Sequence, residues 1–62
     1  MDVIPKNMLM WVCPSCQSEN DLPQPTVTNT TFTCEACNKP FYLIDNPEDP
    51  NSWILESGIA QN

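Results

Sequence analysis

Four cysteines in two Cys-x-x-Cys pairs constrain this chain more than any other feature of its sequence. The candidate ligands are Cys13, Cys16, Cys34 and Cys37, and seventeen residues separate the two pairs. Two intervening residues let the chain turn so that both sulfurs of a pair face one ion, and two such turns can enclose it in a tetrahedron. The pattern predicts one structural zinc ion, with iron less favoured and two local or crossed disulfides as the remaining alternative.

The length of the chain explains why it needs such a site. A domain of 62 residues buries only about 60% of the surface that its unfolded chain exposes, so an apolar core alone gives marginal stability. A structural zinc site contributes roughly 10–16 kcal/mol of apparent binding free energy. That matches or exceeds the net stability of most domains, which is roughly 5–15 kcal/mol. We therefore expect the metal to decide whether the chain folds.

The N-terminal residues predict no secretory signal, because an acid stands at position 2 and no continuous apolar run follows it. No run in the sequence approaches the length of a membrane span. An initiating Met and paired Cys-x-x-Cys motifs favour metal binding in a reducing compartment over disulfides. We therefore expect a cytoplasmic protein without membrane contact, located in a host cell if a phage encodes it.

The charge balance limits the functions open to this chain. Eight acids face two lysines, Lys6 and Lys39, and the formal charge is −6 with no histidine or arginine. Proteins that bind duplex DNA neutralise several phosphates with Lys or Arg, so nucleic-acid binding is disfavoured. The usual general base near neutral pH is missing, and one glycine cannot make a glycine-rich phosphate loop. We therefore expect no enzymatic activity.

Composition divides the chain into a flexible lead-in at 1–7, a metal module at 8–44, and an acidic turn with a C-terminal tail at 45–62. Apolar or β-branched runs in the metal module predict short strands. They cover residues 8–12, 26–28, 31–33 and 41–44, and a turn at Asn29-Thr30 joins the middle two into a hairpin. Residues 51–57 predict a short C-terminal helix that ends at Gly58.

The residues around the cysteine pairs, Trp11–Cys16 and Thr31–Cys37 with Phe41 after them, resemble the zinc ribbon, a four-cysteine fold of the rubredoxin-like group. The resemblance implies a small metal-stabilised β domain with two zinc knuckles and a short three-stranded antiparallel sheet. It also implies that the four cysteines are the metal ligands. Many zinc ribbons carry Gly after the second cysteine of a knuckle, where this chain has Gln17 and Asn38. Because Gln adopts the left-handed conformation less readily than Asn, we expect a strained or differently shaped first knuckle.

A second resemblance points to an electron carrier. Trp11–Cys16 is similar to the second knuckle of rubredoxins, and Tyr42–Asp49 is similar to the stretch that follows their first knuckle. The two pieces stand in reverse order here, and the interval between the cysteine pairs is shorter than in that family. This resemblance implies a four-thiolate iron site.

The function expected from these features is a zinc-stabilised interaction module without enzymatic activity. Trp and Met are favoured at binding surfaces, and an acidic protein attracts a basic one. The expected partner-binding residues are Met8, Met10, Trp53 and Leu55. The chain would act as a small acidic adaptor or regulator, monomeric or weakly dimeric, on a basic protein surface such as that of the transcription machinery. The alternatives are a rubredoxin-like iron electron carrier and a zinc ribbon that binds nucleic acid.

Removal of the metal should unfold the chain, because the core alone is too small to hold it. We expect chelation to abolish the cooperative unfolding transition and to collapse the dispersion of the amide NMR signals. A chelated protein that kept both signals would show that the apolar core is sufficient.

Overall fold

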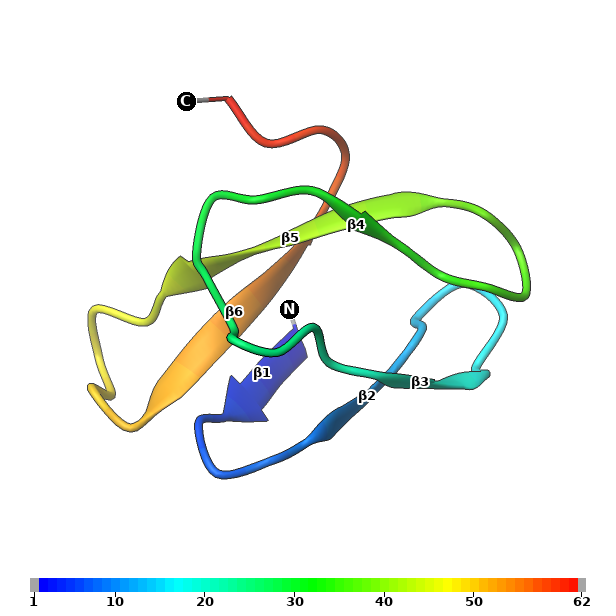
Figure 1. The fold of residues 1–62 in the computed structure, drawn as a ribbon. Coiled ribbons are helices and arrows are strands. Elements are labelled where there is room, and N and C mark those ends of the chain that lie inside the picture. Colours follow the sequence, from blue (N-terminus) through cyan, green and yellow to red (C-terminus); the bar gives the residue numbers. More distant parts are fainter. Residues whose placement is uncertain (1, 62) are drawn as a thin grey trace.

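The computed structural model describes residues 2–61 and contains two antiparallel sheets (Figure 1). Its strands are β1 (Asp2–Pro5), β2 (Met10–Val12), β3 (Glu19–Asp21), β4 (Phe32–Thr33), β5 (Pro40–Asp45) and β6 (Ser52–Ser57). The larger sheet has the order β1-β6-β5-β4, and the smaller sheet is the β2–β3 hairpin. Within residues 2–61 no helix is long and apolar enough to cross a membrane. The fold is a small β domain, as expected, but it has a four-stranded sheet instead of a three-stranded one, and residues 2–61 contain no helix.

The C-terminal tail supplies a central strand of the larger sheet, so the expected helix at 51–57 is wrong. Strand β6 pairs with β1 on one side and β5 on the other, with Leu55 opposite Leu43 and Ile54 opposite Ile44. Three consecutive apolar residues at 53–55 suit a strand with apolar neighbours on both faces. As a central strand, β6 forms backbone hydrogen bonds with neighbours on both sides. These satisfy more of its N–H and C=O groups than one or two helical turns could.

Asp2–Pro5 of the expected lead-in at 1–7 form strand β1 of the larger sheet, and Met1 lies outside the described residues. In β1, Ile4 lies opposite Trp53 of β6 and is buried in the core. Beyond the strand, the Lys6 backbone N–H donates to the carbonyl oxygen of Asn51 at 2.9 Å. The short apolar segment Val3-Ile4 forms a strand because it can pair with the edge of β6 and bury the side chain of Ile4 in the core.

The expected strands in the metal module are confirmed at three of their four positions. The 8–12 strand is present in part as β2, the 31–33 strand as β4, and the 41–44 strand within β5. The hairpin expected at 26–33 does not form, because Phe32 pairs with Phe41 of β5 instead. Residues 26–28 lie outside the strands, and the turn residue Asn29, with φ 58°, donates its N–H to the carbonyl oxygen of Leu43. Tertiary pairing with β5 therefore replaces the local hairpin.

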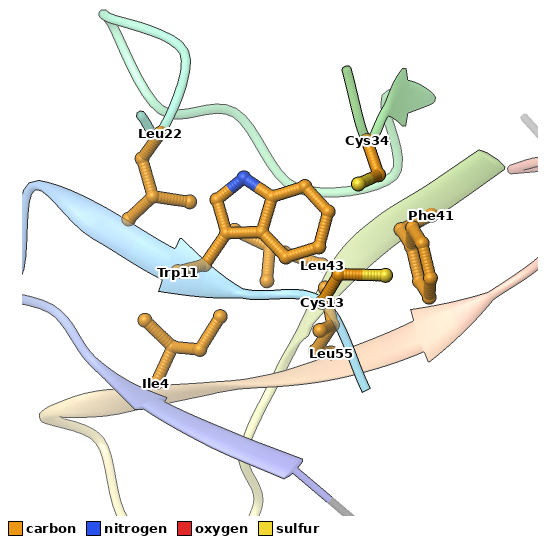
Figure 2. Close-up of a cluster of buried hydrophobic side chains, with 8 residues drawn as sticks. All are labelled: Ile4, Trp11, Cys13, Leu22, Cys34, Phe41, Leu43 and Leu55. Carbon is orange, nitrogen blue, oxygen red and sulfur yellow. The ribbon is translucent and has the colours of Figure 1, made fainter. Parts of the chain in front are cut away.

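Trp11 is the centre of the core and lies between the two sheets (Figure 2). Its side chain is only 2% exposed, and its ring meets Phe32 and Phe41 edge-to-face at centroid distances of 5.1 and 5.2 Å. Such aromatic pairs contribute about 0.5–1.5 kcal/mol beyond the area that they bury. The other members of the buried cluster are Ile4, Cys13, Leu22, Cys34, Phe41, Leu43 and Leu55. Two of the four cysteines thus belong to the apolar core itself.

Replacement of Trp11 by alanine should destabilise the metal-loaded protein by about 3–5 kcal/mol, because it empties the space between the sheets. Trp53→Ala is the matched control, since Trp53 is half-buried against the edge of the core, and should cost about 1–2 kcal/mol. Chemical denaturation in excess metal measures both variants. Equal losses would show that Trp11 has no special place in the core.

Candidate metal centre

The two cysteine pairs form turns of the same shape. In the first knuckle the Gln17 backbone N–H donates to the carbonyl oxygen of Cys13 at 2.7 Å, and in the second the Asn38 N–H donates to that of Cys34 at 2.8 Å. Gln17 and Asn38 both adopt the left-handed conformation, with φ of 62° and 64°. Of the two expected alternatives, a different shape is absent, and the left-handed Gln17 agrees with a strained first knuckle. Gln17 accepts the conformation at a steric cost, because the turn must bring both sulfurs to one point.

Each knuckle is closed by a second hydrogen bond at its base. The Cys13 N–H donates to the carbonyl oxygen of Ser18 at 2.9 Å, and the Cys34 N–H donates to that of Lys39 at 3.1 Å. These bonds continue the ladders beyond the paired strands, so each knuckle is the loop of a β-hairpin. The first hairpin joins β2 to β3, and the second joins β4 to β5.

The structure brings the four candidate ligands together. All four sulfurs lie within 4.8 Å of one another, and the Cys13–Cys37 and Cys16–Cys34 sulfur pairs are each 3.6 Å apart. Sulfurs bound tetrahedrally at about 2.3 Å from one ion lie about 3.8 Å apart, whereas a disulfide bond measures about 2.05 Å. The cysteines are free thiols, and their sulfurs are positioned to hold one metal ion.

The sulfur cluster is buried on one side and exposed to solvent on the other. Cys13 and Cys34 are fully buried, Cys37 is half-buried, and Cys16 is exposed. At Cys16, hydrogen bonds from the side chain and the backbone of Ser18 lower the pKa of the thiol. A bound ion would therefore be shielded from solvent on the side of Cys13 and Cys34 and more open to solvent on the side of Cys16 and Cys37.

Asn20 supports the site although the sequence pattern did not single it out. Its Nδ2 donates to the Cys34 sulfur at 3.4 Å and to the carbonyl oxygen of Ser18 at 3.2 Å. Its Oδ1 accepts the backbone N–H of Glu35 at 3.1 Å. One side chain on β3 thus fixes the second knuckle against the first hairpin. The available sequence signal was an amide side chain alternating with the acids of the strand Glu19–Asp21.

Lys39 makes a second link between the knuckles. Its Nζ donates to the hydroxyl oxygen of Ser15 in the first knuckle at 2.7 Å. Both side chains are exposed, so the bond adds little stability by itself. It does place the one cation near the cluster over the first knuckle, where it partly offsets the negative charge of the thiolates.

Donors around Cys34 favour its charged form. Burial is the largest single influence and raises the pKa of this thiol. The backbone N–H groups of Cys37 and Ala36 and the side chain of Asn20 oppose it, and the net effect lowers the pKa to about 6. Cys34 is therefore a thiolate at neutral pH and is ready to bind a cation.

Cys37 shows the opposite shift. A hydrogen bond from the Lys39 backbone is the largest single influence and lowers the pKa of the thiol, but burial and the neighbouring cysteine sulfurs raise it to about 11. A metal ion must therefore displace a proton from Cys37 at neutral pH. Because protons compete with the metal for this sulfur, metal affinity falls as the pH falls.

Of the four residues expected to bind a partner, one is exposed and the other three are partly or fully buried. Met8 is 42% exposed, whereas Met10 is half-buried on β2. Trp53 packs against the core cluster, and Leu55 is a buried member of it. Strand β6 pairs with β1 and β5, and this pairing fixes Leu55 on the face of the sheet that points into the core. Leu55 therefore contributes to the stability of the domain.

Comparisons with protein-family models, with curated proteins and with solved structures found no match for this chain.

Replacement of Asn20 by alanine should lower the metal affinity by about 10–100-fold, because it removes the amide donor to the Cys34 sulfur and frees the second knuckle. Asn7→Ala, at an exposed position away from the cluster, is the control and should leave the affinity unchanged. Competition with a chromophoric chelator measures both variants across a range of pH. Equal affinities would show that Asn20 does not support the site.

Proposed function

We propose that this chain is a zinc-stabilised interaction module without enzymatic activity, which acts as a small acidic adaptor or regulator. Its partner is a protein with a basic surface, such as a component of the transcription machinery. The observation that carries the proposal is the cluster of four sulfurs within 4.8 Å in a chain with a formal charge of −6. Four thiolates around one ion leave no open ligand position, so the ion has a structural role.

The donor set supports zinc as the resident ion. Structural zinc sites commonly consist of four cysteines in two knuckles, with sulfurs at tetrahedral spacing. Cys13 and Cys34 would hold the ion from the core side, and Cys16 and Cys37 from the more open side. Zinc supplies folding free energy here and no redox chemistry.

A four-thiolate iron site is the second candidate, and the exposure of Cys16 favours it. An iron site with one exposed sulfur could exchange electrons with a docked protein through that edge. The two candidates differ in colour, since an iron site of this kind is red and a zinc site is colourless. We expect colourless protein as isolated, with about one zinc per chain by elemental analysis.

The distribution of cations favours a basic protein over a nucleic acid as the partner. Lys6 lies over the ring of Trp53, with its Nζ 5.8 Å from the ring centroid, and Lys39 is bonded to Ser15. These are the only two basic side chains of the sequence, too few to follow a phosphate backbone. Lys6 lines a surface hollow that also contains the carboxylate of Asp49. The surplus of carboxylates attracts a basic surface instead.

Capture experiments with the zinc-loaded protein in extract from its own cell, or from its host cell, test the proposal. We expect one partner protein with a basic surface to be retained and to elute as the salt concentration rises. Mass spectrometry identifies the partner.

The matched control is Cys34→Ser, which keeps the sequence charge but loses a metal ligand and should unfold. Equal retention of proteins by the folded protein and by this variant would contradict a folded interaction module. Retention of nucleic acid in place of a basic protein would support the zinc ribbon that binds nucleic acid.

A further inference from the structure

The face of the four-stranded sheet that points away from Trp11 is apolar and partly open to solvent. In an antiparallel sheet, residues opposite one another point to the same side. Val3 on β1 lies opposite Ile54 on β6, and Ile54 lies opposite Ile44 on β5. In the next row, Tyr42 of β5 lies beside this apolar line. We call these four residues, Val3, Tyr42, Ile44 and Ile54, the outer sheet face.

The residues of the outer sheet face differ from those of the core in their exposure or in their contacts. Ile54 is buried but does not belong to the core cluster around Trp11. Val3 is 52% exposed, and Tyr42 and Ile44 are half-buried. Burying such a row would release apolar surface from water, at about 25 cal/mol per Å². The outer sheet face therefore has apolar side chains that remain accessible to a binding partner.

A hollow of about 320 Å³ opens on the outer sheet face beside Ile54. Its lining consists of Val3, Asn46, Pro47, Glu48 and Ile54. The turn after β5 forms one wall and is held in place by Asn46, whose Nδ2 donates to the Ser52 hydroxyl oxygen at 3.0 Å. The Oδ1 of Asn46 also accepts the backbone N–H of Glu48 at 3.0 Å. The hollow is thus preformed, mainly apolar, and carries one carboxylate.

Charge decides which partner can cover this face. Glu48 lines the hollow, and Glu56 lies opposite Tyr42. A second copy of the chain would place two formal charges of −6 together with the same carboxylates in contact, and like charges facing one another disfavour association. Anionic lipids and nucleic acids are repelled for the same reason. The complementary partner carries apolar side chains flanked by Lys or Arg.

We propose that the outer sheet face binds a protein segment in which apolar and basic residues alternate. An apolar side chain enters the hollow and packs on Ile54, and its basic neighbours reach Glu48 and Glu56. This inference rests on the proposed function and names the surface that performs it. The surface differs from the one expected from the sequence, because only the pairing of β6 with both β1 and β5 brings Val3, Ile54 and Ile44 into one row.

An NMR titration of the isotope-labelled, zinc-loaded protein with a short synthetic peptide that alternates lysine and valine tests this inference. We expect the amide signals of Val3, Tyr42, Ile44, Ile54 and Glu56 to shift. The dissociation constant should rise with salt concentration. A peptide with glycine in place of each valine keeps the charge and should bind at least about ten-fold more weakly, because nothing fills the hollow.

Two matched pairs of substitutions locate the contact. Val3→Thr keeps the shape and the strand preference of the side chain but adds a hydroxyl, and should weaken binding of the lysine–valine peptide about three- to four-fold. Val12→Thr is the same change at a residue of nearly equal exposure, 51% against 52%, on the other sheet, and should have no effect. Glu48→Gln should weaken binding about three-fold at low salt, and Glu19→Gln on β3 is its control.

The outcomes separate this inference from the proposed function. Shifts confined to the β2–β3 hairpin, with equal effects of Val3→Thr and Val12→Thr, would overturn the outer sheet face as the contact and leave a basic partner in place. Absence of binding by both peptides would overturn the basic partner as well. Shifts of the outer sheet face that depend on protein concentration without any peptide would assign the face to a second copy of the chain.

Discussion

The convergence of four cysteine sulfurs is the constraint on which the rest of the structure depends. The first knuckle belongs to the β2–β3 hairpin and the second to the β4–β5 hairpin, so the sulfur pairs at 3.6 Å join the two sheets. Cys13 and Cys34 are at the same time members of the apolar core. Metal binding and packing around Trp11 therefore stabilise the same arrangement, which is how a chain of 62 residues can hold a small core.

Strand β6 gives the domain its second organising element. Its pairing with both β1 and β5 turns alternate residues to opposite faces of the sheet. Leu55 faces the core, whereas Ile54 faces outward beside Val3 and Ile44. The same strand therefore completes the core and creates the outer sheet face to which we assign partner binding. The C-terminal segment that the sequence placed outside the metal module therefore contributes both to stability and to the proposed binding surface.

The sequence predicted the parts of the structure that depend on local spacing. The Cys-x-x-Cys pairs indicated the sulfur cluster, and the apolar or β-branched runs indicated the strands at 8–12, 31–33 and 41–44. It failed where a residue's neighbours come from distant segments. The short apolar run at 53–55 suits a strand or a helical turn equally well when read alone, and Asn20 is an ordinary polar residue until the second knuckle lies against it.

The sequence by itself determined a small β domain, a net negative charge and two Cys-x-x-Cys pairs suited to one ion, because each follows from composition or from residues a few positions apart. Only the tertiary structure decided that the two ends of the chain pair in one sheet, that Leu55 is buried, and that Val3, Ile54 and Ile44 share an outward row. The physical reason is that strands gain their stability from partners that are far away in the sequence. A strand's apolar residues acquire an inner and an outer side only when that pairing fixes the sheet.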